Sequence, residues 1–470
     1  MKIDNNLYRE TLYLSKQTAR WFYSFLPLQI RYGTDFLNMS KQLEISERWS
    51  IEKLADYQNR CLRKLINHAY KNVPYYHSMF KKYGILPTDI KTINNLEIIP
   101  PLSKDDLRNN FKKLIATNIK NSELICKSTS GTSGRPVHFY LERRQKQYLY
   151  GSPFRWRHFR WGGYEPNNRC ATLYNWRIPA KTSGQRRLFY YDRMRRLLIL
   201  STYDMTRKNI HQYAEALQKH NPEFLHGFPS AIEMMVKYLR EQIVPPPIKP
   251  RAIFTQSEIV YPWQRILIEQ YFGCKIYDWY GMEERAIAAS ECEFHTDYHI
   301  FSEFCIVEVL REGKNVIGEE GELISTPLDN YAMPLLRYKT GDLGMLVNEK
   351  CACGRTLPLM RLSGGRDRNF VVTKSESLIS VTIVDIPNAT KNIEQFQFVQ
   401  EEVGTVTLKI LRKDSFSEED LDLIKRDLKE KFGDMIKVRI KFVERMDRTS
   451  RGKLPLLVQK LKFDKDLYPV

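Results

Sequence analysis

The sequence lacks long hydrophobic runs and has little glycine or proline. No window approaches the roughly 18 consecutive apolar residues of a membrane helix, and the apolar stretch from Trp21 to Ile30 is short and contains Pro27. With 22 glycines and 22 prolines in 470 residues, collagen-like and low-complexity chains are excluded. Hydrophobic residues make up 42% of the chain, enough to build a core, so we expect a globular protein.

Cysteine is scarce, and the N-terminus shows no export signal. Eight cysteines form no evenly spaced framework, a pattern that favours a reducing compartment over a disulfide-bonded secreted domain. The basic, apolar and small-residue series of a secretory signal is absent. We therefore expect a cytoplasmic protein, and its length suggests about two to four domains.

Acidic residues are in the minority. Lys and Arg outnumber Asp and Glu by 19, and residues Leu141–Leu200 carry +11 of this excess. Within that segment Arg155, Arg157 and Arg160 alternate with aromatic residues, a pattern that could stack bases or sugars while neutralising phosphates. This excess of positive charge indicates an anionic partner, such as nucleic acid, a phosphorylated metabolite or acidic lipid headgroups. The plainer alternative is a solvated basic face over a buried aromatic row.

The periodicity of the middle of the chain predicts an α/β domain with parallel strand pairing. Short apolar runs alternate there with helical stretches at Glu223–Phe228, Ala231–Leu239, Arg251–Thr255, Trp263–Phe272 and Lys275–Trp279. Two helices are predicted before this domain, over Ile51–His68 with Ser50 as its cap and over Lys104–Leu114.

The last hundred residues predict a separate, smaller unit. Alternating apolar residues predict strands around Val406–Ile410 and Val438–Phe442. A capping box at Ser417–Asp420 and Gly433 bound a helix between them. A ββαβ-type α+β domain is therefore expected, with the boundary in Gly364–Arg368, giving a large domain 1–366 and a small domain 367–470.

The strongest local signal is a Ser/Thr/Gly-rich segment, Ser128–Pro136. Its glycines let the backbone approach a phosphate, while hydroxyl and backbone N–H groups supply donors. It lacks the Gly-Lys-Ser/Thr ending of a Walker loop, and such a segment alone is more often a linker. Four further motifs follow it in order, at Tyr280–Glu284, Arg337–Asp342, Gly364–Asp367 and Arg448–Lys453.

This ordered series resembles the adenylate-forming superfamily, above all its phenylacetate-CoA ligase branch and the related CapK-type capsular polysaccharide biosynthesis proteins. The resemblance covers nearly the whole chain and includes Gly227–Ser230 and Phe272–Cys274. It implies a large α/β domain and a small, mobile C-terminal α+β domain. It also implies a ligase that converts a carboxylate to an acyl-adenylate with ATP, releases pyrophosphate and passes the acyl group to CoA or another acceptor.

The resemblance also assigns residues to this chemistry. Phosphate binding falls to the Ser/Thr/Gly-rich segment, with Thr129, Ser130, Gly131, Thr132, Ser133 and Gly134. Tyr280 would stack near adenine, Asp342 would bind the ribose hydroxyls, and Glu284 would bind Mg²⁺. Lys453 would be the mobile adenylation lysine, which suits a step that brings two anions together. Further nucleotide contacts are expected from Ser257, Glu258, Gly281 and Arg366.

Two departures from the family pattern keep other hypotheses open. Glu283 stands where relatives usually carry Ser or Thr, and the hinge reads Arg366–Asn369 where they have paired Asp residues. A catalytically degenerate scaffold is therefore the second hypothesis, and a basic nucleic-acid-binding protein is the third.

A cysteine knuckle at Cys351 and Cys353 predicts a metal site. With Cys292 and either His295 or His299 it would offer four ligands that suit tetrahedral Zn²⁺. The resemblance implies a structural zinc between the same regions and favours His299. The alternative is a group of reduced, buried thiols beside an ordinary histidine.

The sequence leaves the acid and its acceptor unnamed. Candidate acid-pocket segments are Tyr174–Arg177, His226–Ser230 and Thr255–Glu258. Because the segment Leu141–Leu200 resembles a region beside the acyl site in relatives, we expect it to recruit an anionic acceptor. CoA and a nucleotide-linked or lipid-linked sugar are the candidates, and a homodimer stays open.

Overall fold

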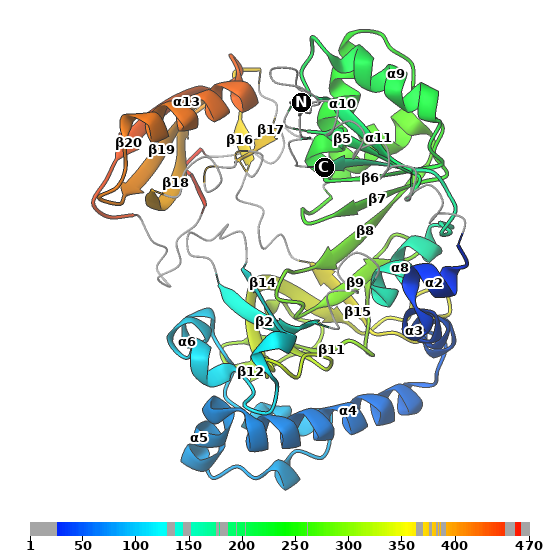
Figure 1. Ribbon diagram of the computed structural model, residues 1–470, viewed down its shortest axis with the longest axis vertical. Coiled ribbons are helices and arrows are strands. Elements are labelled where there is room, and N and C mark those ends of the chain that lie inside the picture. Colours follow the sequence, from blue (N-terminus) through cyan, green and yellow to red (C-terminus); the bar gives the residue numbers. More distant parts are fainter. Residues whose placement is uncertain are drawn as a thin grey trace, which may run out of the picture.

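A 13-stranded sheet and a separate four-stranded sheet organise the protein (Figure 1). In the first, the order is β12-β11-β13-β14-β15-β10-β9-β8-β7-β6-β3-β5-β4, and in the second it is β20-β19-β18-β21. The computed structural model describes residues 26–128, 137–143, 152–174, 178, 187–193, 195–202, 204–260, 262–362, 370–375, 378–381, 384, 386, 392–446 and 456–461.

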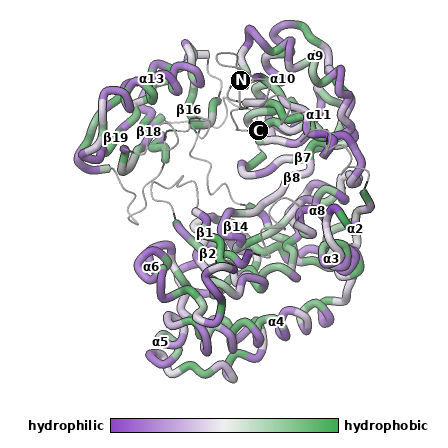
Figure 2. The backbone as a smooth tube through the Cα atoms, in the orientation of Figure 1, coloured by the Kyte–Doolittle hydropathy of each residue, from purple (hydrophilic) through white to green (hydrophobic). Residues whose placement is uncertain are grey.

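Helices precede the large sheet. They are α2 (Leu28–Tyr32), α3 (Thr34–Ser46), α4 (Ile51–Asn72), α5 (Pro74–Tyr83), the 3₁₀ turns η1 (Pro87–Asp89) and η2 (Ile93–Ile98), α6 (Lys104–Asn109), and η3 (Phe111–Leu114) and η4 (Asn121–Glu123). The predicted cap of α4 is confirmed, because the Ser50 side chain accepts a hydrogen bond from the Lys53 N–H at 3.3 Å. Figure 2 shows hydrophobic and hydrophilic residues alternating along α4, whose apolar side packs into the core.

The second predicted helix, Lys104–Leu114, is interrupted. Helix α6 ends at Asn109, and residues from Phe111 continue as a 3₁₀ turn. At the break the Asn110 side-chain amide donates to the Asp106 carbonyl oxygen at 3.0 Å. The Asn110 backbone has left helical geometry, with φ −114° and ψ 19°, and its side chain bonds to the backbone at the helix end, which the apolar spacing alone does not reveal.

The parallel part of the large sheet confirms the α/β prediction. Its neighbouring parallel strands are β5 (Leu197–Ser201), β3 (Cys170–Tyr174), β6 (Phe224–Gly227), β7 (Ala252–Gln256) and β8 (Lys275–Gly281), with β4 (Phe189–Asp192) antiparallel at the edge. Helices α9 (Ile210–His220), α10 (Pro229–Glu241) and α11 (Pro262–Phe272) share one apolar cluster with these strands. Helix α8 (Pro153–Trp161) lies against other side chains of the same strands, including Phe254.

The remaining strands extend this sheet in antiparallel fashion. They are β9 (Ala288–Glu291), β10 (Tyr298–Ile300), β11 (Cys305–Arg311), β12 (Lys314–Asn315), β13 (Gly321–Pro327), β14 (Tyr338–Val347) and β15 (Leu359–Leu362). A two-stranded hairpin of β1 (Leu124–Ser128) and β2 (His138–Glu142) packs on the core that contains α4 and α5.

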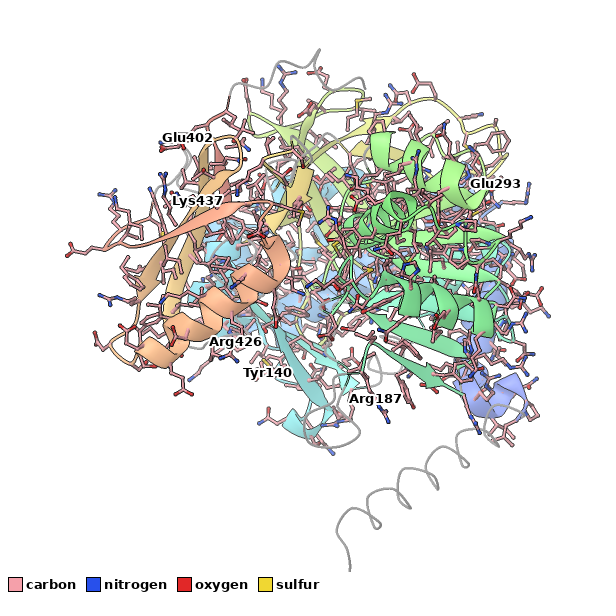
Figure 3. All side chains as sticks on the ribbon, turned by 90° about the horizontal axis from the view of Figure 1, so that it is seen from above. Tyr140, Arg187, Glu293, Glu402, Arg426 and Lys437 are labelled. Atoms are coloured by element: carbon pink, nitrogen blue, oxygen red, sulfur yellow. The ribbon has the colours of Figure 1, made fainter. Side chains whose placement is uncertain are left out.

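The C-terminal unit has its own sheet and core. Its elements are β16 (Phe370–Val372), β17 (Leu378–Ser380), β18 (Ile393–Glu402), β19 (Thr405–Arg412), α13 (Glu418–Phe432), β20 (Lys437–Phe442) and β21 (Leu457–Gln459). The predicted ββαβ order is confirmed, and the Ser417 side chain caps α13 by accepting from the Asp420 N–H at 3.3 Å. In Figure 3 this unit carries Glu402, Arg426 and Lys437, and it lies beside the large sheet.

Among the described residues no helix is both long enough and apolar enough to cross a bilayer.

Candidate active site

Two residues expected to bind the nucleotide meet where β8 ends. Tyr280 is the penultimate residue of β8, and Asp342 lies on β14. The Tyr280 hydroxyl donates a hydrogen bond to Asp342 Oδ2 at 2.8 Å, although 62 residues separate them. The Asp342 side chain is buried and the Tyr280 ring is half-buried. The structure thus brings together the predicted adenine-stacking ring and the predicted ribose-binding carboxylate.

Glu284 is held by a second tyrosine. It follows β8 in a turn completed by Arg285, whose φ of 56° is left-handed. The Tyr338 hydroxyl donates to Glu284 Oε1 at 3.0 Å, and both side chains are buried. Burial and the neighbouring carboxylate raise the pKa of Tyr338, so this hydroxyl stays a donor. Because a carboxylate has about four lone-pair positions, this hydrogen bond leaves oxygen sites that suit Mg²⁺.

Ser257 and Glu258 lie at the same edge of the sheet. They directly follow β7, whose last residue, Gln256, pairs with Trp279 of β8. Ser257 has a φ of 69°, a conformation that costs energy for a residue other than glycine and is concentrated at functional sites. The two residues therefore lie near the Tyr280–Gly281 end of β8, as a nucleotide-binding role requires.

Three parts of the predicted site lie outside the described residues. They are the phosphate-binding segment Thr129–Gly134, Arg366 and the adenylation lysine Lys453. The described strands on either side of the first segment, β1 and β2, pair in antiparallel fashion with Ser128 opposite His138.

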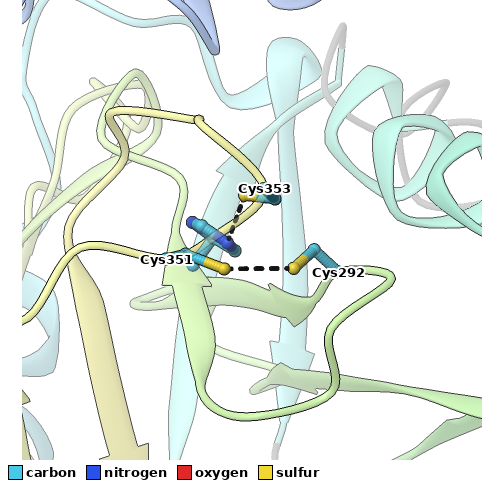
Figure 4. A group of neighbouring side chains, drawn as sticks. Cys292, Cys351 and Cys353 are labelled. Atoms are coloured by element: carbon cyan, nitrogen blue, oxygen red, sulfur yellow. Dashed lines mark hydrogen bonds between the residues drawn. The ribbon is translucent and has the colours of Figure 1, made fainter.

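The predicted metal ligands form one cluster. One ligand atom from each of Cys292, His299, Cys351 and Cys353 lies within 4.8 Å of the others. The Cys292 and Cys351 sulfurs are 3.5 Å apart, and Cys353 Sγ is 3.4 Å from His299 Nε2 (Figure 4). Four ligand atoms at this spacing could hold a metal ion, and the set of three thiols and one imidazole suits tetrahedral zinc.

The surroundings of His299 prepare it as a ligand. Its Nδ1 lies 3.4 Å from the Leu357 carbonyl oxygen, which can only accept, so Nδ1 carries the proton and Nε2 faces the thiols. Burial lowers the pKa of His299 to about 4, which keeps the imidazole neutral. His295, the alternative, instead contacts Glu291 and the Tyr277 ring. Of the two histidines, His299 is therefore the one placed to bind a metal ion beside the three cysteines.

Helix α8, which lies within the basic segment Leu141–Leu200, does not form a solvated basic face. Arg157 is fully buried, with Nη2 2.7 Å from Glu303 Oε1 and 2.6 Å from the Leu43 carbonyl oxygen. Arg160 Nη2 lies 3.0 Å from Glu47 Oε2. The expectation that these two arginines recruit an acceptor is therefore wrong. The alternation suggested a stripe of period two, whereas the helix buries Phe154, Arg157, His158 and Trp161 at helical spacing.

A buried polar network beneath this edge was missed by sequence reasoning. The Asp278 carboxylate accepts hydrogen bonds from the Thr255 and Tyr298 hydroxyls, and its backbone N–H donates to Glu291 Oε2 at 3.0 Å. Burial raises the pKa of Asp278 to about 7. The network ties β7, β9 and β10 to β8 two residues before Tyr280. The available signal was an acidic residue inside the apolar run Lys275–Trp279.

Comparison with known families and proteins supports the predicted resemblance. A model of the CapK C-terminal domain family matches residues 371–460. The protein CapK of Staphylococcus aureus is 26% identical over 89% of this chain and 92% of its own length. The phenylacetate-coenzyme A ligase of Thermus thermophilus is 24% identical over 76% of this chain and 80% of its own.

Solved structures share the fold. A 2-hydroxyisobutyryl-CoA ligase in complex with 2-HIB-AMP and CoA superposes with a TM-score of 0.57 at 18% identity, covering 88% of this chain and 91% of that one. The same ligase in its postadenylation state gives a TM-score of 0.54 at 17% identity, covering 89% and 91%. The resemblance to adenylate-forming ligases and the predicted fold class are confirmed, and the relatives support an enzyme of this kind.

Proposed function

We propose that this protein activates a carboxylic acid with ATP and transfers the acyl group to CoA or another anionic acceptor. The hydrogen bond between Tyr280 and Asp342 carries the proposal, because it joins at the carboxyl end of β8 two residues to which the resemblance assigns nucleotide binding. Open α/β sheets bind ligands at that edge. Relatives named as phenylacetate-coenzyme A ligases and a similarly folded CoA ligase support the reaction class.

In the first step a carboxylate oxygen of the acid attacks the α-phosphorus of ATP. The new bond joins the acid to AMP, and the bond to the β,γ-phosphates breaks to release pyrophosphate. Mg²⁺ bound by Glu284 would neutralise phosphate charge. Thr129–Gly134 would hold the β- and γ-phosphates, and Lys453 would donate hydrogen bonds where negative charge develops.

The resemblance to adenylate-forming ligases assigns the other nucleotide contacts. Tyr280 presents its ring near adenine, and Asp342 binds the ribose hydroxyls. Ser257, Glu258, Gly281 and Arg366 complete this group. In the second step the acceptor attacks the acyl carbon, its proton leaves to solvent or a base, and AMP departs.

The same proposal includes a domain division and a metal. Residues 1–366 form the large domain, and residues 367–470 form a small mobile domain that brings Lys453 to the site. A structural Zn²⁺ would be held by Cys292, His299, Cys351 and Cys353, and it would tie the connection between β14 and β15 to β9 and β10. A place in surface polysaccharide biosynthesis, with a nucleotide-linked or lipid-linked sugar as acceptor, rests on the resemblance to CapK-type proteins.

The test is pyrophosphate release from ATP with a panel of aryl, fatty, amino and hydroxy acids, each with and without CoA. Acid-dependent release supports adenylation, and thioester formed with CoA identifies the acceptor. Release that no acid stimulates would instead favour the degenerate scaffold, which the departures at Glu283 and Arg366–Asn369 motivate.

A further inference from the structure

Helix α4 carries a row of cations along its exposed side. Successive residues of an α-helix are about 100° apart around the axis, so the residues 7, 11 and 18 positions after Lys53 return to within about 20° of it. These residues are Arg60, Lys64 and Lys71, and all four side chains of this basic row are exposed. At a rise of about 1.5 Å per residue the basic row is about 27 Å long. Figure 1 places α4 at one end of the long axis of the molecule, far from α9 and α10.

The basic row is not paired with acidic side chains. Within the part of the chain that the structure describes, none of its four cations forms an ion pair, whereas Arg157 and Arg160 of α8 do. Beyond Asp56, which lies four residues before Arg60, helix α4 contains no further Asp or Glu. The basic row therefore keeps its positive charge available for a partner.

Helix stability explains the two ends of α4 but not its middle. Glu52 in the first turn and Lys71 in the last turn both suit the helix dipole. Arg60 and Lys64 lie four residues apart in the middle of the helix, where like charges repel and an acid at one of the two positions would stabilise the helix. A binding role accounts for two cations at these positions.

The packing of α4 restricts which partner can reach the basic row. Its apolar side is buried in the core, and η1 and η2 lie against a second side. There Arg63 Nη1 donates to the Lys91 carbonyl oxygen at 2.8 Å, and the Ile93 N–H donates to Asn59 Oδ1 at 2.9 Å. A helix covered on two sides cannot enter the groove of a nucleic acid duplex, and it cannot bury its apolar side in a bilayer. The basic row can only be contacted from outside.

The side chains around the basic row also argue against small ligands and single strands. Lys53 Nζ lies 4.7 Å from the Trp49 ring centre, and the Arg60 guanidinium carbon lies 5.8 Å from that of Tyr57. Both rings are half-buried, so no exposed ring beside the row is placed to stack an unpaired base. Cations spread along a helix surface do not surround a single phosphate, as a concave site would. They suit a broad surface that carries many negative charges.

We propose that the exposed side of α4 binds the surface of an anionic phospholipid bilayer. Clusters of Lys and Arg on amphipathic helices bind acidic lipids, and each cation near the surface raises partitioning about fivefold. Because the apolar side of α4 belongs to the core, this binding is electrostatic and reversible. The inference is independent of the proposed adenylation, since α4 contains none of the residues proposed to bind the nucleotide.

The experiment measures sedimentation of the whole chain with phosphatidylcholine vesicles that contain or lack phosphatidylserine. The wild-type protein is expected to bind only the vesicles with phosphatidylserine. Replacing three cations of the row should lower this partitioning roughly 100-fold, since each contributes about fivefold, in the variant Arg60→Gln, Lys64→Gln, Lys71→Gln. Glutamine has a helix propensity close to that of Lys and Arg, and circular dichroism should show an unchanged helix content. Raising NaCl from about 0.1 M to 1 M should abolish the binding, because the screening length falls from about 10 Å to 3 Å.

The matched control removes the same charges from the C-terminal unit. It also replaces one Arg and two Lys at exposed positions, all on β20, in the variant Lys437→Gln, Arg439→Gln, Lys441→Gln. This variant should bind the vesicles within about threefold of the wild-type protein, because distant charges are screened by salt. A wild-type protein that does not bind phosphatidylserine vesicles, or equal losses in the two triple variants, would overturn the inference. Tighter binding of the row to duplex DNA or single-stranded RNA than to the vesicles would also overturn it.

Discussion

The Cys/His cluster proposed to bind a metal and the sheet edge proposed to bind the nucleotide lie on neighbouring strands but are organised differently. The cluster brings together Cys292 and His299, from the end of β9 and from β10, with Cys351 and Cys353, from the connection between β14 and β15, and their ligand atoms lie within 4.8 Å of one another. The edge joins Tyr280 to Asp342 and Glu284 to Tyr338 in buried or half-buried pairs, while its proposed partners come from residues 129–134 and 453. We therefore expect changes in the compact cluster to affect stability, and changes at the edge, whose further partners are proposed in residues 129–134 and 453, to affect the proposed reaction.

This contrast separates two kinds of variant. Changes in the cluster or in the buried arginine should alter unfolding, and changes at the edge should alter nucleotide use in a folded protein. Each prediction below tests one side of that division.

The largest effect is expected for the double variant Cys351→Ser, Cys353→Ser. Elemental analysis should find about one zinc per chain in the wild-type protein and none in the variant. Because structural zinc contributes on the order of 10 kcal/mol to folding of small zinc domains, the variant should unfold at a clearly lower temperature. Cys126→Ser, at an exposed cysteine outside the cluster, should change neither quantity. A zinc-free wild type and a fully stable double variant would favour buried thiols instead.

Breaking the buried ion pair comes next. Arg157→Met leaves the Glu303 carboxylate buried without its partner, which should lower the free energy of unfolding in urea by about 3–5 kcal/mol. Arg160→Gln loses a partly exposed pair and should cost about 1 kcal/mol or less. Adding Glu303→Leu to Arg157→Met should recover part of the loss. Equal costs for the two single variants would contradict the assigned burial of Arg157.

Asp342→Asn tests the nucleotide edge. Loss of the charged acceptor should raise the KM for ATP roughly tenfold or more, since a hydrogen bond to a charged group contributes about 1.5–3 kcal/mol. The urea midpoint should stay within about 0.5 M of wild type, because the side chain serves binding. An unchanged KM for ATP would show that Asp342 does not bind the nucleotide.

Tyr280→Phe should have a smaller effect. It keeps the ring near adenine and removes only the hydroxyl that donates to Asp342. This hydrogen bond orients the Asp342 carboxylate and does not itself reach ATP, so we expect a loss of only about 1 kcal/mol in ATP binding, which is a roughly fivefold rise in the KM for ATP. Tyr280→Ala, which also removes the ring, should raise KM further. Equal effects of the two substitutions would argue against stacking.

The smallest expected effect concerns the His226 imidazole, which we expect not to become protonated in the ordinary pH range. Burial and the charge of Arg155 lower the pKa of His226 to about 3, so its imidazole should stay neutral from pH 8 down to about pH 5. Nitrogen-15 NMR of histidine-labelled protein measures this, with His226→Gln assigning the resonance. A midpoint near pH 6.5 would show an ordinary, solvated imidazole and contradict the burial of His226 beside Arg155.

Local patterns predicted much of the fold. The Ser50 and Ser417 caps set helix starts from sequence alone, because a cap depends on a few neighbouring residues. The break at Asn110 escaped, since it depends on a side-chain hydrogen bond that apolar spacing does not encode. The role of Arg157 escaped for a different reason. Its partner, Glu303, lies 146 residues away, so only the fold reveals the pair.

The candidate site likewise combines features that the sequence predicted with features that only the fold reveals. The cysteine knuckle and the resemblance predicted a cluster of Cys292, Cys351 and Cys353 with His299, and the structure brings these four side chains together. The Leu357 carbonyl oxygen that orients the His299 ring could not be predicted from the sequence. The pairing of Tyr280 with Asp342 was predicted only as membership of one site, because motif order gives no distance. Asp278 and its hydroxyl partners come from three strands, and no spacing in the sequence joins them.

Acid-dependent exchange of labelled pyrophosphate into ATP, measured for the wild-type protein and for Lys453→Ala, tests the central claim most directly. Adenylation predicts exchange in the wild-type protein and a loss on the order of 100-fold in the variant, because Lys453 would act on charge developing at the α-phosphate. Circular dichroism should show both proteins equally folded. Exchange at the wild-type rate in Lys453→Ala, or no exchange in the wild-type protein with any acid of the panel, would contradict it.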